Sequence, residues 1–163
     1  MIVVSNTSPI TSLAAIGQLD LLRQLYGKII IPEAVYRELT EVNYPVPGTI
    51  EVQTCDWIEI KSLGDRNQLL GLFSQPLDEG ESWAIVLTLE LSADLLLIDE
   101  RRGRSEANRL GLRITGLLGV LVEAKQKKLI SALKPLLDSL KETAQFRVTE
   151  QLYIKILQMV GEG

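Results

Sequence analysis

The feature that most constrains the fold is an alternation between short apolar runs rich in β-branched residues and longer amphipathic stretches. Such runs are typical of strands buried on both faces, and the stretches between them have helical periodicity. Alternation of this kind predicts an α/β fold, with three α/β/α layers around a central parallel sheet of four to five strands. The expected strands are Ile2 to Ser5, Ile29 to Ile31, Trp57 to Ile60, Leu95 to Ile98 and a short strand near Arg113 to Thr115.

Helices are expected in the stretches between these strands. The first breaks at Gly17, and the second begins at Pro32, which suits a first helical turn because it lacks an amide hydrogen. The stretch Asn43 to Gly48 contains two prolines and a glycine, which favours a loop. The expected helices are Ser8 to Tyr26, Pro32 to about Val42, Asp78 to Leu91, Arg101 to Leu110, Gly116 to Lys125, Ile130 to Leu140 and a last helix with Leu152, Tyr153, Ile156, Leu157 and Val160 on one face.

Length and composition favour one domain over residues 1–163. A chain of 163 residues with 46% hydrophobic content can bury one sizeable core but divides poorly into two. Apolar runs such as Leu95 to Ile98 are far shorter than the roughly 20 residues that span a bilayer, so no membrane contact is expected. Ile2, Val3 and Val4 follow the first residue without a basic region or cleavage site, so a cytoplasmic location is expected.

The absence of histidine narrows the chemistry more than any other compositional fact. Without histidine, Ser-His and Cys-His mechanisms are excluded. Because Cys55 is the only cysteine, a zinc site built from several thiolates is excluded as well. Any chemistry must use carboxylates, hydroxyls, amines or a bound ion, and oxygen-rich sites suit magnesium or manganese. The net charge of −4 does not indicate a general affinity for nucleic acid, so such binding would require a local basic patch.

Polar residues follow the expected strands at the edge where open parallel sheets bind ligands. Asn6 comes after the first strand, Asp99 after the fourth, and Glu38 lies on the helix after the second. The helix before the fourth strand opens with Asp78, Glu79, Gly80 and Glu81. Oxygen donors that converge from these places would bind a hard cation, whereas one exposed carboxylate binds it weakly.

Each of these residues also has a purely structural explanation. Asn6 suits a helix N-cap, Asp78 and Glu81 match a capping box, and Asp99 suits an N-cap as well. Glu38, taken alone, is typical of a solvated surface residue. These explanations account less well for the position of all the acids at one end of one sheet.

Four segments of the chain resemble the PIN domain, a small metal-dependent nuclease fold. The resemblance extends over nearly the whole chain, and the sequence after Thr115 is similar to a bacterial and archaeal subgroup of poorly defined function. The segments are Val3-Val4-Ser5-Asn6-Thr7-Ser8-Pro9, Ile31-Pro32-Glu33-Ala34-Val35-Tyr36-Arg37-Glu38-Leu39, Leu77-Asp78-Glu79-Gly80-Glu81 and Leu96-Leu97-Ile98-Asp99-Glu100-Arg101-Arg102-Gly103-Arg104.

The resemblance implies a catalytic Mg²⁺ or Mn²⁺ site formed by Asn6, Glu38, Glu81 and Asp99, with Glu79 or Asp78 as alternatives to Glu81. The first position departs from the family pattern, because PIN nucleases usually have aspartate where this chain has Asn6. An amide oxygen can bind a hard cation but adds no negative charge. The sequence leaves open whether Asp78, Glu79 or Glu100 replaces that charge.

The implied reaction is hydrolysis of RNA phosphodiester bonds, in which a metal activates water and offsets charge on the phosphate. Thr7 and Ser8 are candidates for hydrogen bonds to a carboxylate or a phosphate. The densest basic cluster, Arg101, Arg102, Arg104, Arg109 and Arg113, begins two residues after Asp99 and could hold RNA. The alternative is an ordinary solvated helix face in which Glu100 and Glu106 pair with these arginines. Lys125, Lys127 and Lys128 form a weaker second patch.

Three functions remain as hypotheses. The first is a metal-dependent ribonuclease, one form of which is the toxin of a toxin–antitoxin pair with a small antitoxin protein as partner. The second, favoured by Asn6, is a catalytically weakened PIN-like module that binds RNA or protein. A receiver-like or phosphatase-like protein is disfavoured because the first strand does not deliver an aspartate nucleophile. The resemblance also implies a homodimer.

Overall fold

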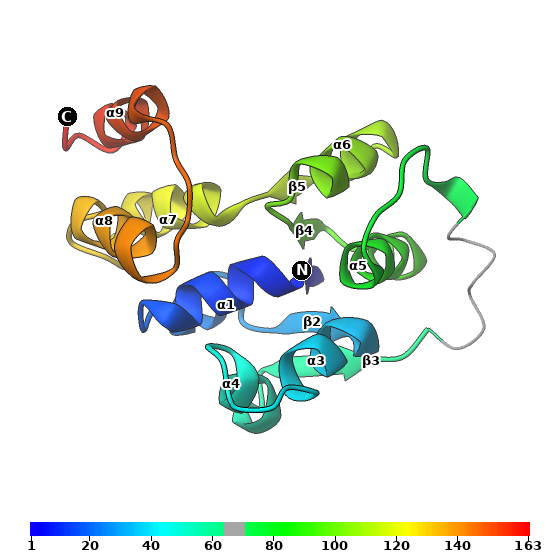
Figure 1. Cartoon of the computed structure of the whole chain (residues 1–163). Coiled ribbons are helices and arrows are strands. Elements are labelled where there is room, and N and C mark those ends of the chain that lie inside the picture. Colours follow the sequence, from blue (N-terminus) through cyan, green and yellow to red (C-terminus); the bar gives the residue numbers. More distant parts are fainter. Residues whose placement is uncertain (64–70) are drawn as a thin grey trace.

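The central element of the fold is a five-stranded parallel sheet with the strand order β3-β2-β1-β4-β5. The structure is a computed structural model that describes residues 1–63 and 71–163. The chain starts in the middle of the sheet, adds two strands on one side and then crosses over to add two on the other (Figure 1). The strands are β1 (Val3–Ser5), β2 (Ile29–Pro32), β3 (Ile58–Lys61), β4 (Leu95–Leu97) and β5 (Ile114–Thr115).

Helices cover both faces of this sheet, which confirms the predicted three-layer α/β/α fold. In Figure 1, α5 and α6 lie to the right of the strands, and α1, α7, α8 and α9 lie to the left. The helices are α1 (Thr7–Ala15), α2 (Asp20–Tyr26), α3 (Glu33–Thr40), α4 (Thr49–Thr54), α5 (Glu79–Glu90), α6 (Arg101–Arg109), α7 (Leu117–Gln126), α8 (Lys134–Thr143) and α9 (Glu150–Met159).

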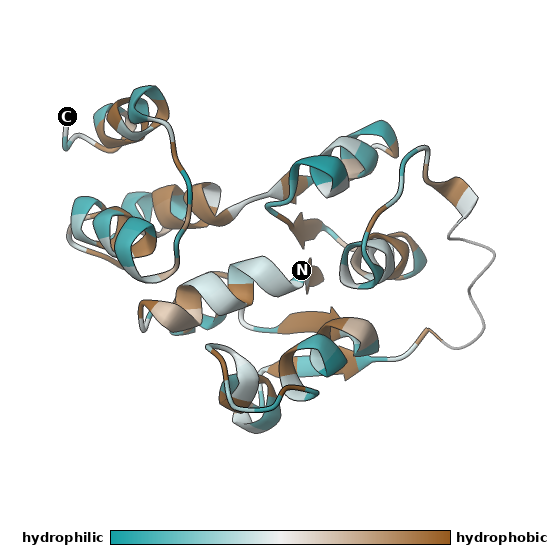
Figure 2. Cartoon of the chain, in the orientation of Figure 1, coloured by the Kyte–Doolittle hydropathy of each residue, from teal (hydrophilic) through white to brown (hydrophobic). Residues whose placement is uncertain are grey.

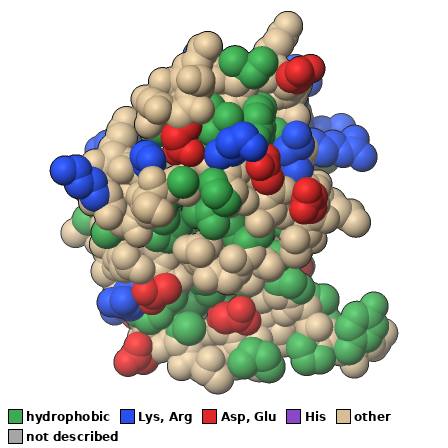
Figure 3. Space-filling view, turned by 90° about the vertical axis from the view of Figure 1, so that its left-hand side faces the viewer, with side chains coloured by type: hydrophobic (Ala, Val, Ile, Leu, Met, Phe, Trp, Pro, Cys, Tyr) green, Lys and Arg blue, Asp and Glu red, His purple; other side chains and the backbone are tan. Residues whose placement is uncertain are grey.

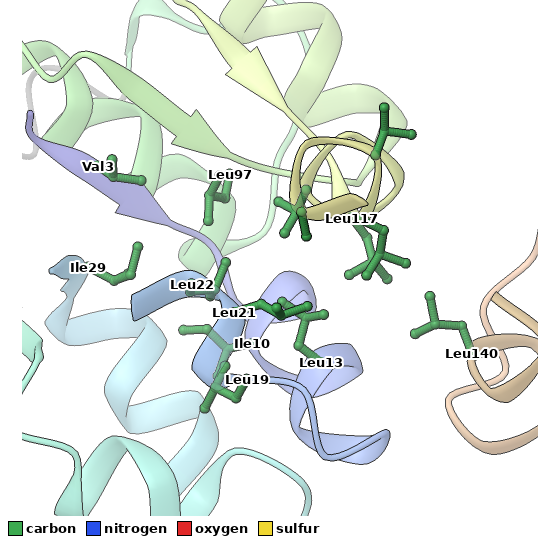
Figure 4. Packing of buried hydrophobic residues seen from close by; sticks show 14 of the residues in the cluster. Val3, Ile10, Leu13, Leu19, Leu21, Leu22, Ile29, Leu97, Leu117 and Leu140 are labelled. Carbon is green, nitrogen blue, oxygen red and sulfur yellow. The ribbon is translucent and has the colours of Figure 1, made fainter. Parts of the chain in front are cut away.

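Successive residues of the central strands enter two separate cores. Val3 of β1 belongs to the larger core with α1, α2 and α7, whereas Val4 faces the smaller core under α5 and α6. The strands are hydrophobic on both faces for this reason, as their brown colour in Figure 2 shows. Figure 4 shows how side chains of three strands and of the helices meet in the larger core, among them Val3, Ile29, Leu97, Ile10, Leu13, Leu21, Leu22 and Leu117.

Most expected elements are present with bounds that differ by one or two residues. The first helix breaks as predicted, since Gly17 has a φ of +70° between α1 and α2. Two expectations were wrong in detail. Pro32 ends β2 and precedes α3 instead of lying in its first turn, and the helix predicted from Ile130 begins only at Lys134, because Pro135 lies in the first turn of α8.

The sequence prediction missed α4, a helix of six residues directly after the loop that ends at Gly48. It is too short to display a helical period in the sequence. Thr49 ties it to the body of the protein, because its hydroxyl donates to the carbonyl oxygen of Leu39 (2.8 Å). No helix in the described ranges has the length and apolar character needed to cross a bilayer.

Candidate metal centre

The carboxyl ends of β1 and β4 meet at the point where the strand order of the sheet reverses. Ser5 is in register with Leu97, and the backbone N–H of Asn6 donates to the carbonyl oxygen of Leu97 (2.9 Å). Asn6 and Asp99 therefore leave adjacent strands at the same edge of the sheet. Ligands of open parallel sheets bind at such a reversal.

Glu81 is held at this edge by a capping box at the start of α5. Asp78 Oδ1 accepts a hydrogen bond from the Glu81 amide (2.7 Å), and Glu81 Oε1 accepts one from the Asp78 amide (3.2 Å). The structural explanation offered for this pair is thus correct, but it uses only one oxygen of Glu81. Oε2 is buried and has no hydrogen-bond partner.

Asp99 shows the same division between its two oxygens. Oδ1 accepts a hydrogen bond from the amide of Leu117, the first residue of α7 (2.8 Å), whereas Oδ2 is buried without a partner. Asp99 does not cap the helix that follows it, because Glu100 occupies the N-cap position of α6. Its carboxylate instead links the end of β4 to α7.

Asn6 occupies the N-cap position of α1, but its side chain makes no capping hydrogen bond. The residue is 3% exposed, and its Oδ1 has no partner. A buried polar atom without a partner costs about 1–3 kcal/mol, so each one requires an explanation. Among the described residues, the buried side-chain oxygens in this condition are Asn6 Oδ1, Glu81 Oε2 and Asp99 Oδ2.

A cavity of about 340 Å³ opens beside Asn6. Thr7 and Ser8 hold two of the acids that line it, because the Thr7 hydroxyl donates to Glu38 Oε2 (2.7 Å) and the Ser8 hydroxyl to Glu100 Oε1 (3.3 Å). The cavity therefore brings together the N-cap and first turns of α1, part of α3, and the N-cap residues of α5 and α6. Its polar lining consists of Asn6, Thr7, Ser8, Thr11, Glu38, Asp78 and Glu100.

Gly80 permits α3 and α5 to approach each other at this cavity. A Cβ atom at Gly80 would lie 2.8 Å from Glu38 Oε2 and 3.3 Å from Asn6 Oδ1. Any side chain there would displace these two oxygens. The glycine thus leaves the space in which the oxygens of Glu38 and Asn6 lie close to each other.

A family model described as DUF3368: PIN domain matches residues 2–162. The chain belongs to the PIN domain family. No curated protein matches it. The predicted resemblance is thereby confirmed over nearly the whole chain.

The electrostatics of this PIN domain disfavour negative charge on two of the site carboxylates. Burial, reinforced by the nearby charges of Asp78 and Glu100, raises the pKa of Glu81 to about 7. Burial also raises the pKa of Asp99, and Glu100 adds to the effect, while the Leu117 amide and Arg104 oppose it. A cation at this edge of the sheet would favour the ionised form of both groups.

The PIN domain does not bring all the predicted ligands into one cluster. Within the described ranges, no group of three or more Asp, Glu or Cys side chains is close enough to hold a metal ion. Glu38, Asp78 and Glu100 are exposed, whereas Asn6 and Glu81 are buried. Glu79 lies outside the cavity with Asn6 and forms an ion pair with Arg37 (3.1 Å).

The predicted RNA-binding arginines differ in their surroundings. Arg101 and Arg102 are exposed on the first turn of α6. Arg104 is partly buried, and its guanidinium donates to the carbonyl oxygen of Ile98 (2.9 Å). Arg109 pairs with the buried Glu106 (3.2 Å), as the alternative explanation of the cluster expected.

The weaker lysine patch, at the C-terminal end of α7, is also largely paired. Lys125 lies 3.3 Å from Glu162, and Lys127 lies 3.1 Å from Glu123. On the face of the molecule formed by the helices at the left of Figure 1, basic and acidic side chains are interspersed (Figure 3). Such a face offers no continuous basic surface to a nucleic acid.

The prediction from sequence left open whether Glu100 supplies negative charge to the metal site, and the structure places Glu100 in the lining of the cavity beside Asn6. Its position directly after Asp99 was visible, but adjacent residues at a strand end point in different directions. The prediction from sequence also gave no role to Arg37, which forms an ion pair with Glu79 in the structure. The sequence signal for it was its place next to Glu38 on α3.

Proposed function

We propose that this PIN domain is a divalent-metal-dependent ribonuclease that hydrolyses RNA phosphodiester bonds. One observation carries the proposal: three buried oxygens without partners, from Asn6, Glu81 and Asp99, lie at the sheet edge where the strand order reverses. The scaffold uses one atom of each carboxylate and leaves the other free. Buried acceptors in this condition are expected where a cation supplies the missing partner.

The donor set fits Mg²⁺ or Mn²⁺, because every candidate ligand offers oxygen and none offers sulfur or imidazole. Asn6, Glu81 and Asp99 would hold the ion, with Glu38 and Glu100 reaching it from the cavity wall. A bound divalent cation supplies a Lewis acid that offsets charge on the phosphate and lowers the pKa of water. Thr7 and Ser8 orient Glu38 and Glu100 through their hydroxyl groups.

A second function is favoured by the amide of Asn6. Replacement of a carboxylate by an amide removes one negative charge from the ligand set and should weaken cation binding. The same fold would then act as a module that binds RNA or a protein partner without turnover. Glu100 opposes this reading, because it brings a carboxylate to the cavity that contains Asn6.

The decisive test is cleavage of a mixed-sequence RNA with Mn²⁺ or Mg²⁺ by the wild type, Asp99→Asn and Asn6→Asp. The nuclease proposal expects metal-dependent cleavage by the wild type, an increase in Asn6→Asp and a fall of at least about a hundredfold in Asp99→Asn. Cleavage by Asn6→Asp alone would indicate a silenced nuclease. Inactivity of all three proteins would overturn the proposal in favour of the binding module.

The proposed function also includes two protein partners, a second copy of this chain and a small antitoxin protein. PIN domains commonly form homodimers, so a mass twice 18.1 kDa is expected by light scattering. If the protein is a toxin that acts in the cytoplasm, a small antitoxin protein should bind it and inhibit RNA cleavage. Co-expression with the protein encoded beside its gene, followed by the cleavage assay, tests that expectation.

A further inference from the structure

A second cavity of about 460 Å³ adjoins the one that contains Asn6. The two share Glu38 and Asp78 in their linings, so they form one continuous depression between α3 and the start of α5. Carboxylates dominate the second cavity, which is lined by Glu38, Glu41, Asp78 and Glu79 as well as Ala34 and Gly80. Among described residues that line either cavity, Arg37 is the single basic one.

Arg37 is held in this depression by a weak ion pair. Its Nη2 lies 3.1 Å from Glu79 Oε1, and the two side chains are 47% and 65% exposed. Exposed pairs of this kind contribute about 0–1 kcal/mol, because water screens them and two long side chains must be ordered. An incoming anion can therefore displace Glu79 from Arg37 at little cost.

A strand of RNA that crosses this depression needs positive charge there. Its phosphates would otherwise face several carboxylates, and the guanidinium group binds a phosphate through two parallel hydrogen bonds. The arginines on α6 that were predicted for this role lie outside the linings of both cavities. Arg37, by contrast, belongs to the same helix turn as Glu38.

We propose that Arg37 is a ligand for a backbone phosphate of single-stranded RNA, and that Glu79 forms an ion pair with Arg37 until the strand binds and replaces it. The proposal rests on the nuclease function and identifies where the substrate enters that site. It also gives Glu79 a role opposite to that of a metal ligand. Loss of the Glu79 charge should strengthen RNA binding, whereas loss of a metal ligand should weaken it.

The test is RNA affinity, measured by fluorescence anisotropy with a labelled single-stranded RNA of mixed sequence. Ca²⁺ replaces Mg²⁺ because it takes the same kind of oxygen ligands, and a denaturing gel verifies that the RNA remains intact. The variants are Arg37→Gln, Arg37→Lys and Glu79→Gln. The matched controls are Arg23→Gln, an exposed arginine that pairs with Asp20 on α2, and Glu33→Gln, an exposed acid on α3 outside both cavities.

Arg37→Gln is expected to weaken RNA binding about tenfold, the effect of losing one charge-assisted contact. The slope of log affinity against log salt concentration should fall by about 0.7, as for one phosphate contact on a single strand. Arg37→Lys should lie between the wild type and Arg37→Gln, because it keeps the charge but loses the planar fork. Glu79→Gln should bind RNA several times more tightly, and both controls should match the wild type.

Three results would overturn the proposal: no RNA binding by the wild type, equal affinities for Arg37→Gln and Arg23→Gln, or no gain of affinity in Glu79→Gln over Glu33→Gln. The cleavage assay separates this proposal from the nuclease function. A wild type that binds RNA with the predicted dependence on Arg37 but does not cleave it would refute the nuclease and leave Arg37 as an RNA ligand. Cleavage without that dependence would refute the role of Arg37 alone.

Discussion

Glu81 uses one carboxylate oxygen for the scaffold and leaves the other for the proposed metal site. Its Oε1 completes the capping box of α5, and its Oε2 remains buried without a partner. The position and type of this residue are visible in the sequence, as are those of Asn6 and Asp99. The sequence does not reveal that one oxygen of each carboxylate is hydrogen-bonded and the other is not, because this depends on which backbone amides approach each carboxylate.

The raised pKa of Glu81 leads to a prediction for stability in the absence of metal. The folded-state pKa of about 7 lies above the usual value of 4.5, so the folded protein binds this proton more tightly than the unfolded chain. The contribution of Glu81 to stability is therefore present below pH 4.5 and is lost as the pH rises through about 7. Glu81→Gln should melt at a higher temperature than the wild type at pH 8 in EDTA, and the difference should shrink at pH 5.

Thermal melts followed by circular dichroism at both pH values check this prediction. Glu33→Gln provides the control, because Glu33 is exposed and carries the same charge. A difference between Glu81→Gln and the wild type that does not change with pH would contradict the assignment. The same substitution should weaken Mn²⁺ binding in calorimetry, so the charge that destabilises the fold would be the charge that the site requires.

Among the elements, the central strands β1, β2 and β4 were predicted well because parallel strands buried on both faces are largely apolar. The helices on long amphipathic stretches were predicted for a similar reason. Errors occurred where the local sequence carries little information. Helix α4 was missed because it is short and largely polar. The start of α8 was misplaced because it depends on Pro135 and on contacts with residues distant in the sequence. Glu162, for example, accepts a hydrogen bond from the Leu133 amide (2.7 Å) at the beginning of that helix.

Helix α6 is connected to the segment before α5 by a buried carboxylate. Glu106 is 1% exposed and accepts hydrogen bonds from Arg109 (3.2 Å) and from the hydroxyl and backbone amide of Ser74. Arg109 and Ser74 together lower the pKa of Glu106 to about 2. This carboxylate thus holds the segment that leads to Asp78 and the capping box.

We expect Glu106→Gln to lower the melting temperature at pH 7 and to speed amide hydrogen exchange at Ser74. A folded-state pKa below the usual 4.5 contributes stability that is present above pH 4.5 and is lost as the pH falls towards 2. The deficit of the variant should therefore be smaller at pH 3 than at pH 7. Hydrogen exchange followed by mass spectrometry provides the measurement, and equal protection of Ser74 in both proteins would refute the role of Glu106.

At the scale of the whole molecule, the net charge of −4 requires that RNA binding be local. Arg101 and Arg102 are the exposed members of the predicted arginine cluster at the start of α6. If RNA extends from the cavities towards α6, the double variant Arg101→Gln, Arg102→Gln should bind RNA more weakly for every sequence tested. For this variant, the slope of log affinity against log salt concentration should fall by about 1.4, as for two phosphate contacts on a single strand.

A salt titration of the anisotropy signal checks this expectation. The double variant Lys127→Gln, Lys128→Gln is the control, since it removes the same charge from the lysine patch at the C-terminal end of α7. A larger loss of affinity in the control would place the RNA on α7 instead. The sequence already ranked the lysine patch as the weaker one, but the ion pair between Lys127 and Glu123 is visible only in the fold.

Gly103 of α6 is buried against the free oxygen of Glu81. A Cβ atom at this glycine would lie 2.8 Å from Glu81 Oε2 and 2.6 Å from Ile98 Cδ1. One added methyl group would therefore compete for space with the oxygen that we propose as a cation ligand, although the side chain of Gly103 has no donor atom of its own. In evolutionary terms, a substitution at Gly103 could abolish the proposed activity while every acidic residue of the candidate site remained in the sequence.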